Sequence, residues 1–270
     1  MTITQDELLS VADKTIILTG SSGLLGSSYA TALLERGTNM ALIDNNIKNS
    51  LKIKNKFKNF DTIIEVYDCD LSKPNQISST FKKILKDFQS IDVLINNAAF
   101  TSRQTFHTKD FKNYETHSFE LWKNSFKVNI DAVHLCTQQV IPQMKKQHKG
   151  NIINISSTYG VVGPTFSTYD DENLFTPPGY AVTKSAVLNF TRYVANLYGK
   201  YGIRCNTFTP SGVATDKLSK RFVKRYSSHN AFNRMATTQD YIGPIIFLCS
   251  DASAYMTGSN LIVDAGWTAR

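Results

Sequence analysis

The chain has 270 residues, 41% of them hydrophobic and 11% aromatic, a composition that suits a folded protein with one sizeable core and excludes a disordered one. Its 30 Lys and Arg residues outnumber 22 Asp and Glu residues, giving a formal net charge of +8, but no basic patch is interleaved with base-stacking aromatics. We therefore expect no nucleic-acid partner, and no apolar run approaches the roughly 20 residues that span a bilayer, so we expect no membrane partner either.

The start of the chain and its cysteines indicate a cytoplasmic protein. The opening segment "MTITQDELLSVADK" is polar and acidic, unlike a secretory signal. The cysteines lack paired spacing, and the five histidines lack metal-ligand spacing, so we expect buried free thiols and no metal. The cysteines are Cys69, Cys136, Cys205 and Cys249.

The first predicted strand, residues 16–18, runs into a glycine-rich turn and then a helix, within "KTIILTGSSGLLGSSYATALLERG" (residues 14–37). Gly20, Gly23 and Gly26 allow a sharp turn and let a ligand approach the backbone closely. Backbone N–H groups and the helix dipole favour an anion at such a helix N-terminus. The segment therefore predicts a site for the pyrophosphate of a dinucleotide.

A second predicted strand, "NMALID" at residues 39–44, ends on Asp44, 18 residues beyond Gly26. At this offset a carboxylate can accept hydrogen bonds from the ribose hydroxyls of a dinucleotide. Asn45 and Asn46 follow, with no Arg or Lys to compensate a 2′-phosphate, so NAD(H) is favoured over NADP(H). The alternative is that Asp44 caps the next helix.

Strand and helix patterns alternate through the rest of the chain, which is typical of a doubly wound parallel sheet. The pattern predicts one α/β Rossmann domain over residues 1–270, with about seven strands flanked by helices. The further predicted strands are 62–72, 91–99, 150–157, 203–210 and 260–266, and the further predicted helices include 73–89, 119–148, 178–201 and 238–250.

Polar residues follow several of these strands at the point where each strand ends. Ligands of doubly wound sheets bind beyond the carboxyl ends of the strands, so these residues are candidates for one shared site. Besides the glycine turn and Asp44, they are Asp70, Asn96–Ala99, Ser156–Ser157 and Pro210–Thr215.

Tyr180 and Lys184, in "GYAVTKSA", are four residues apart on the helix predicted at 178–201 and therefore share one face. A free phenol has a pKa of about 10 and transfers protons poorly at neutral pH. A neighbouring ammonium and a nicotinamide cation favour the phenolate, which makes Tyr180 a candidate general base or acid. Lys184 can also hold the cofactor ribose.

Seven motifs resemble, in this order, those of the short-chain dehydrogenase/reductase family: "TGSSGLLG", "DCDL", "NNAA", "FKVNIDAV", "NIINISS", "YAVTK" and "NTFTPSGVAT". The resemblance runs from about Lys14 to the C-terminus and implies a catalytic tetrad. In it Ser157 hydrogen-bonds the substrate oxygen and Tyr180 transfers the proton, with Lys184 as its partner. Asn129 anchors a water that leads protons to Lys184. Taken singly, Ser157 could be a turn cap, and Asn129 could merely satisfy backbone groups.

The same resemblance implies further contacts to the dinucleotide along the strand ends. Asp70 then meets the adenine amine, Asn96 lies beside the adenosine, and Thr215 contacts the nicotinamide carboxamide. The full set of predicted cofactor-binding residues is Gly20, Ser22, Gly23, Leu24, Leu25, Asp44, Asp70, Leu71, Asn97, Ala98, Ala99, Tyr180, Lys184, Pro210, Gly212, Val213 and Thr215.

Three features depart from the usual pattern of the family. The spacing TGxxGxxG is commoner in longer epimerase and dehydratase members, but 270 residues leave no room for their additional substrate domain. Ser157 and Tyr180 are 23 residues apart, about ten more than usual, so residues 160–178 predict an inserted surface loop over the active site. Ser211, in "PSG", stands where the family usually has glycine.

The insertion, "GLLG", "LNFTRYVANLYGKYGIR" and "NLIVDAGW" also resemble a subgroup of bacterial surface-sugar and flagellin-glycan biosynthesis reductases. Residues 211–236 predict a substrate lid with an apolar stripe at Leu218, Phe222 and Tyr226. The basic flank of this lid either recognises an anionic sugar derivative or is a solvated helix face. The flank consists of Lys217, Lys220, Arg221, Lys224 and Arg225.

These patterns together predict an NAD(H)-dependent oxidoreductase that interconverts a secondary alcohol and a carbonyl, on a sugar or nucleotide sugar in surface-glycan biosynthesis. A homodimer or homotetramer is expected, paired through the helices predicted at 119–148 and 178–201. Two alternatives remain open: a sugar epimerase or dehydratase that holds NAD tightly, and a non-catalytic dinucleotide-binding module.

Overall fold

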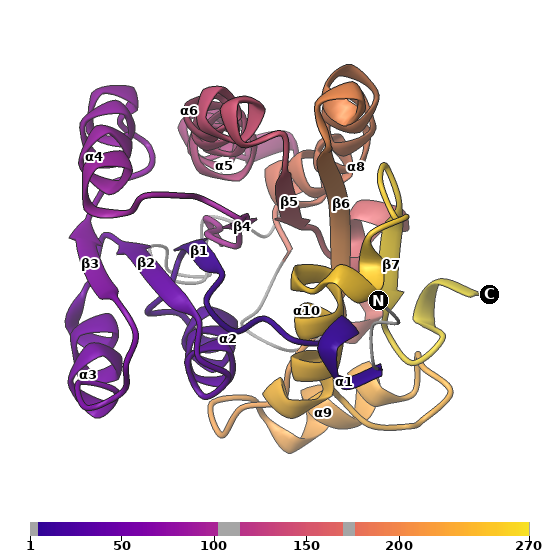
Figure 1. Cartoon of the computed structure of the whole chain (residues 1–270). Helices are drawn as coiled ribbons and strands as arrows, with labels where there is room; N and C mark the ends of the chain where they lie inside the picture. Colours follow the sequence, from indigo (N-terminus) through magenta and orange to yellow (C-terminus); the bar gives the residue numbers. More distant parts are fainter. Residues whose placement is uncertain (1–4, 102–113, 170–175, 270) are drawn as a thin grey trace.

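The computed structural model describes residues 5–101, 114–169 and 176–269. Its centre is one seven-stranded parallel sheet in the order β3-β2-β1-β4-β5-β6-β7 (Figure 1). The strands are β1 (Thr15–Thr19), β2 (Asn39–Asp44), β3 (Ile64–Asp68), β4 (Val93–Asn96), β5 (Gly150–Ile155), β6 (Ile203–Pro210) and β7 (Asn260–Val263). The predicted fold class is confirmed.

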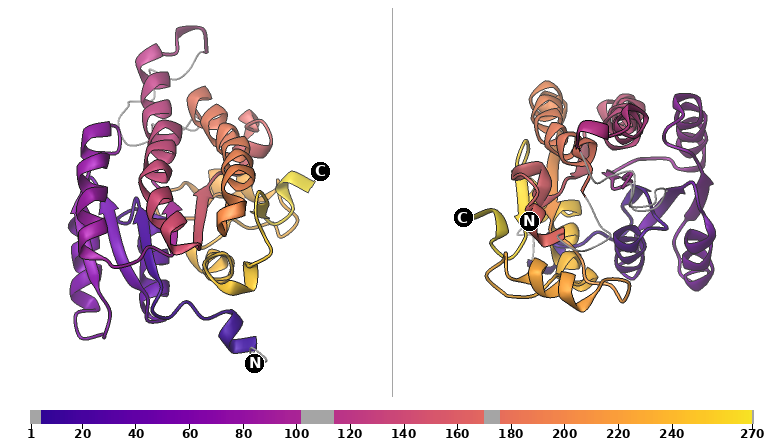
Figure 2. Two further views of the ribbon diagram at one scale, coloured as in Figure 1. Left: turned by 45° about the horizontal axis from the view of Figure 1, so that its top comes forward. Right: turned by 180° about the vertical axis from the view of Figure 1, so that it is seen from behind.

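Helices cover both faces of the sheet. Figure 1 shows α4, α5, α6 and α8 on one face and α2, α3 and α10 on the other, and Figure 2 shows α4, α6 and α8 running side by side. The helices are α1 (Gln5–Leu8), α2 (Leu24–Leu34), α3 (Lys48–Lys56), α4 (Pro74–Asp87), α5 (Phe119–Phe126), α6 (Ala132–Gln147), α7 (Thr158–Val161), α8 (Pro178–Tyr198), α9 (Lys220–Ser227) and α10 (Ile242–Cys249). A π-helical turn, Lys127–Asp131, joins α5 to α6.

The five inner strands are buried because helices cover both faces of the sheet, whereas the edge strands β3 and β7 are only partly buried. In β1, Ile16 and Leu18 contribute to the core beneath α2 and α10, whereas Ile17 contributes to the core beneath α4 and α6. This is the alternation expected of a strand, in which successive side chains point to opposite faces. The four cysteines are buried and unpaired, as predicted.

The strand order changes direction between β1 and β4, so the connections leaving these neighbouring strands diverge to opposite faces. In doubly wound sheets the crevice at such a point, beyond the carboxyl ends of the strands, is where ligands bind. No helix in the described part of the chain is long and apolar enough to cross a membrane.

Candidate active site

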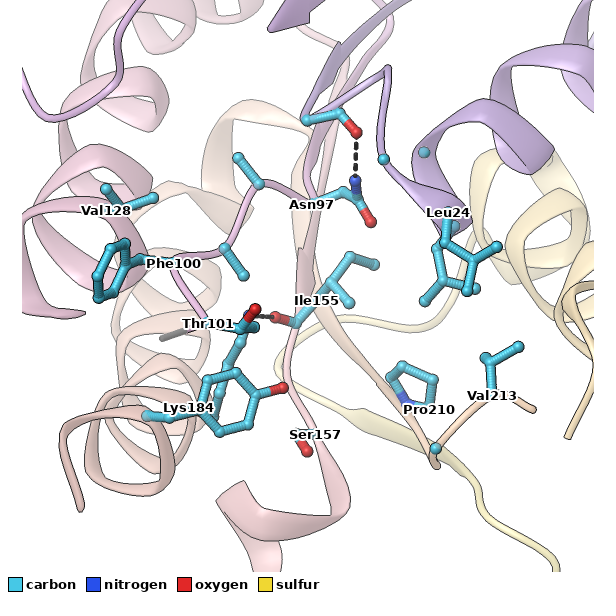
Figure 3. A pocket seen from close by; sticks show the side chains of 18 of the residues that line it. Leu24, Asn97, Phe100, Thr101, Val128, Ile155, Ser157, Lys184, Pro210 and Val213 are labelled. Atoms are coloured by element: carbon cyan, nitrogen blue, oxygen red, sulfur yellow. Dashed lines mark hydrogen bonds between the residues drawn. The ribbon is translucent and has the colours of Figure 1, made fainter. Parts of the chain in front are cut away.

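A cavity of about 750 Å³ opens beyond the carboxyl ends of the central strands (Figure 3). Every predicted cofactor-binding residue except Asn96, which was expected beside the adenosine, lines it, and so does Ser157. This volume lies within the usual range for ligand and cofactor sites. The sequence therefore predicted correctly which strand ends form one cavity, although the chemical role of each residue stays a prediction.

The glycine turn shows two kinds of glycine. Gly20 has φ +67°, and a Cβ there would lie 2.7 Å from the Cα of Ala98; a Cβ on Gly26 would collide with the Gly20 carbonyl oxygen. A Cβ on Gly23 would meet only the Gly20 oxygen, at the ordinary contact distance of 3.4 Å. The fold therefore tolerates a side chain at Gly23, and the absence of one leaves space in the cavity for a ligand. Gly23 is also the N-cap of α2, which has no side-chain cap. These features fit a pyrophosphate at the helix N-terminus.

Asp44 ties the end of β2 to this turn. One carboxylate oxygen accepts from the backbone N–H of Ser22 at 2.9 Å, and the other accepts from that of Asn46 at 2.9 Å. The N-cap of α3 is Ile47, so the alternative in which Asp44 caps that helix is wrong. Remaining lone pairs of the carboxylate can accept from ribose hydroxyls, since each oxygen offers two.

Asn96 does not lie beside the cavity, which corrects one prediction. Its side chain is 3% exposed and donates to the Asn154 side-chain oxygen at 2.8 Å, inside the core. Asn97 lines the cavity instead (Figure 3). Its amide donates to the carbonyl oxygens of Thr19 at 3.0 Å and of Gly20 at 3.1 Å. Because successive side chains of a strand point in opposite directions, one of two adjacent asparagines points into the core and the other toward the cavity.

Asp70 stands at the cavity wall with a carboxylate held in its charged form. Burial pulls its pKa upward, but hydrogen bonds from the backbone and hydroxyl of Ser72, together with nearby Lys73, outweigh burial and lower the pKa. A carboxylate can accept from an amine, so Asp70 suits the predicted contact with the adenine.

Lys184 is the most deeply buried charged residue of the cavity, at 3% exposure. Its Nζ donates to the Ile155 carbonyl oxygen at 2.6 Å (Figure 3) and lies 6.0 Å from the ring centroid of Tyr180. Burial lowers the pKa of Lys184 to about 8. The ammonium is thus held next to Tyr180 by one backbone oxygen, and no carboxylate of the described residues forms an ion pair with it.

Ser157 is the N-cap of α7, and its Oγ accepts from the backbone N–H of Tyr159 at 3.2 Å. This bond uses a lone pair and leaves the hydroxyl hydrogen for another acceptor. The neighbouring Ser156 also lines the cavity, and its Oγ donates to the Lys184 carbonyl oxygen at 2.7 Å, which connects the end of β5 to α8. Ser157 can therefore cap α7 and still donate a hydrogen bond to a substrate oxygen, so the two predicted roles are compatible.

Asn129 is fully buried in the π-helical turn and does not line the cavity, unlike the other three members of the predicted tetrad. Its amide oxygen accepts from the Phe100 N–H at 2.7 Å, and its Nδ2 donates to the Phe100 oxygen and to Thr183. In this structure Asn129 thus fastens the segment after β4 to α8. Its predicted role toward a water stays a prediction.

Helix α9 and the residues just before it, in the segment predicted as a lid, present only the apolar stripe to the cavity. Leu218, Phe222 and Tyr226 line it, whereas none of the five basic residues of the flank does. Ser211, which departs from the family pattern, pairs with the Tyr226 hydroxyl at 3.1 Å. That same hydroxyl accepts from the Gly212 N–H at 2.7 Å, so this tyrosine orders the loop after β6.

Sequence reasoning missed several residues that line the cavity, among them Tyr159, Tyr169, Thr176 and Met235. Tyr169 and Thr176 belong to the segment predicted as a surface loop, yet both are buried against the cavity. That prediction is wrong for these two residues, while residues 170–175 lie outside the described residues. The aromatic residues between Ser157 and Tyr180 in the sequence, which include Tyr159 and Tyr169, were the available signal.

Comparison with known proteins defines the family. The sequence profile described as enoyl-(acyl carrier protein) reductase matches residues 21–268. An L-rhamnose 1-dehydrogenase (NAD(P)(+)) from Azotobacter vinelandii is 28% identical, covering 94% of this chain and 96% of that protein. A cyclopentanol dehydrogenase from Comamonas testosteroni is also 28% identical, covering 96% and 98%.

Among solved structures, a short-chain dehydrogenase from Leptospira borgpetersenii with bound NAD⁺ superposes with a TM-score of 0.84 at 28% identity, covering 99% of this chain and 97% of that one. With the profile match and the geometry above, the chain belongs to the short-chain dehydrogenase/reductase family. It is accordingly an oxidoreductase.

Proposed function

We propose that the protein is an NAD(H)-dependent oxidoreductase that interconverts a secondary alcohol and the corresponding carbonyl of a sugar or related compound. The observation that carries the proposal is that Ser157, Tyr180 and Lys184 line the same cavity as the glycine turn. The relatives named for L-rhamnose and for cyclopentanol, and the NAD⁺ in the Leptospira structure, support it. A non-catalytic module would have no need of these three side chains.

The bound cofactor would exchange the hydride at its nicotinamide. In oxidation Tyr180 receives the hydroxyl proton of the alcohol, and in reduction it returns a proton to the carbonyl oxygen. Ser157 donates its hydroxyl hydrogen to the same oxygen and orients it. Below its pKa of about 8, Lys184 is an ammonium that favours the phenolate of Tyr180 and lies where it can hold the cofactor ribose.

NAD(H) is the cofactor that the cavity wall favours. Asp44, Asn45 and Asn46 line the cavity at the end of β2, and no Lys or Arg of the described residues lines it there. A 2′-phosphate would meet the carboxylate of Asp44 without a compensating cation. We therefore propose a higher kcat/KM with NAD(H) than with NADP(H); equal values would contradict this assignment.

The wider setting follows the sequence predictions. We propose a cytoplasmic enzyme with a single dinucleotide-binding domain, a lid at about 211–236 and an inserted segment at about 160–178. Its place in surface-glycan biosynthesis, and nucleotide sugars as substrates, rest on the resemblance alone. The anionic substrate has no support from the cavity, because the basic flank does not line it.

A substrate screen tests the proposal against the epimerase alternative. Purified protein is assayed for reduction of NAD⁺ and oxidation of NADH with a panel of pentoses, hexoses, their keto forms, cyclic alcohols and nucleotide sugars. Net turnover of added cofactor supports the oxidoreductase. Retention of nicotinamide through gel filtration, with interconversion of sugars but no net turnover of added NADH, would support the epimerase or dehydratase instead.

A further inference from the structure

The end of the cavity next to Tyr180 is bounded by an aromatic wall consisting of Tyr159, Tyr169, Phe222 and Tyr226. These residues come from α7, from the inserted segment that follows it, and from α9, which is about 50 residues further along the chain. All four belong to one buried cluster, and Tyr180 packs against it. The wall therefore borders the place where the proposed proton transfer occurs.

Three hydroxyl groups form a chain along this wall. Thr176 Oγ1 donates to Tyr169 Oη at 2.8 Å, and Tyr169 Oη donates to Tyr159 Oη at 2.9 Å. All three side chains line the cavity, and none is more than 7% exposed. Tyr169 and Thr176 are contributed by the inserted segment, so the insertion supplies buried polar atoms to the site.

Ring contacts hold this wall in place. Tyr169 packs against Phe222, with ring centroids 5.6 Å apart, which joins the inserted segment to the lid helix. Behind the wall, Trp267 packs against Tyr226 at 4.5 Å and against Tyr159 at 6.1 Å. These ring contacts restrict the positions of the two tyrosines of the hydroxyl chain, as a recognition site requires.

The aromatic wall itself carries no charged side chain. Of the described residues that line the cavity, the charged ones are Asp44, Asp70 and Lys184, which the proposed function assigns to the cofactor and to catalysis. A phosphate or carboxylate placed against the aromatic wall would lose hydration without gaining a cation. Such desolvation of an unpaired charge is costly.

We propose that the aromatic wall selects an uncharged hydroxylated ring, a neutral sugar or cyclic polyol, and that Tyr169 and Thr176 are specificity-determining residues. The inference rests on the proposed function, because it names the substrate class of that site. Aromatic faces pack against the C–H groups of such a ring, while hydroxyl groups of the chain exchange hydrogen bonds with its hydroxyls. A site built to bond a hydroxyl discriminates against analogues that lack it.

The test measures binding and turnover separately. Calorimetry on the protein saturated with NADH compares neutral pentoses and hexoses with their monophosphates and with cyclopentanol and cyclohexanol, and kcat/KM is measured for the same compounds. A neutral sugar should bind about tenfold or more tightly than its own monophosphate and than the cyclic alcohols. Selective binding without turnover would refute the proposed function and leave the inference standing.

Three variants then locate the selection. Tyr169→Phe and Thr176→Val remove one hydroxyl each, and Tyr67→Phe is the matched control, because Tyr67 is buried and bonds Asp87 at 2.8 Å but does not line the cavity. The first two variants should each lower kcat/KM, or affinity, for the neutral sugar about tenfold, the worth of one good hydrogen bond. Values for the cyclic alcohols, and all values for the control, should change less than about twofold.

Three results would overturn the inference. The first is a phosphorylated or carboxylated compound as the best ligand, which would leave the oxidoreductase proposal intact if it is turned over. The second is an equal loss for sugars and cyclic alcohols in Tyr169→Phe and Thr176→Val, since that indicates a structural role only. The third is no measurable binding of any neutral sugar.

Discussion

Burial alters the chemistry of Lys184 in a way that stability measurements can detect. The folded protein lowers the pKa of this lysine from 10.5 to about 8, because burial disfavours the ammonium. Between these values the unfolded chain binds a proton that the folded chain does not, so stability rises with pH. Below pH 8 the cost of burying the charge is fully present, and it corresponds to roughly 3 kcal/mol.

We therefore expect Lys184→Met to change the pH dependence of unfolding. In urea titrations of the cofactor-free protein, the variant should gain stability relative to the wild type at pH 7, and this gain should shrink by up to roughly 3 kcal/mol by pH 10.5. The exposed Lys52→Met is the control and should run parallel to the wild type. A constant difference for Lys184→Met across this range would contradict the assignment of a strained buried ammonium.

In the glycine turn, we expect Gly26 to be required for folding and Gly23 to be required for cofactor binding. Gly26→Ala should destabilise the protein by roughly 1–3 kcal/mol, because its Cβ would collide with the backbone of Gly20. Gly23→Ala should cost about 1 kcal/mol or less, as expected of an N-cap change, but should weaken NADH binding at least about tenfold. Thermal unfolding and calorimetry check both; a Gly23→Ala protein that binds NADH normally would show that the pyrophosphate lies elsewhere.

At the scale of elements, α9 has two faces with different expected effects. Replacing the exposed cations Lys220, Arg221 and Lys224, together with Arg225, by Gln should change KM for the best substrate less than about twofold, since none of them lines the cavity. Phe222→Leu, on the opposite face, should raise KM about tenfold. Steady-state kinetics on both variants decide the matter. A larger increase in KM from the basic face would instead support the hypothesis that the flank recognises an anionic substrate.

The order of strands and helices was predictable because apolar runs and their spacing are local properties of the sequence. Residues 203–210, for example, were predicted as a strand and form β6 with these bounds. The assignment of Asn96 to the site failed, because the end of β4 decides which of two adjacent asparagines points into the core. The burial of Tyr169 and Thr176 could not be predicted from the local sequence. It depends on contacts of Tyr169 with Phe222, which is distant in the sequence, and with Tyr159, which belongs to another helix.

At the scale of the whole molecule, α5 and α8 leave large apolar side chains in solvent. Phe119 is 70% exposed, Tyr193 65% and Leu197 42%. Exposed apolar groups on packed helices mark surfaces for association, so we expect a homodimer or homotetramer. Light scattering at micromolar concentration should show it, and Tyr193→Glu should weaken it, whereas Phe60→Glu, next to α3 on the other side of the sheet, should not. A monomeric wild type would contradict the expectation.

The central claim is that this cavity transfers a proton through Tyr180 while a hydride passes to or from the cofactor. Tyr180→Phe keeps the aromatic ring and removes the transferable proton. With the best substrate of the screen, we expect turnover to fall 10²–10⁴-fold or so, while calorimetry shows NADH affinity within about threefold of the wild type. A Tyr180→Phe protein that retains more than about a tenth of the wild-type rate would contradict the account.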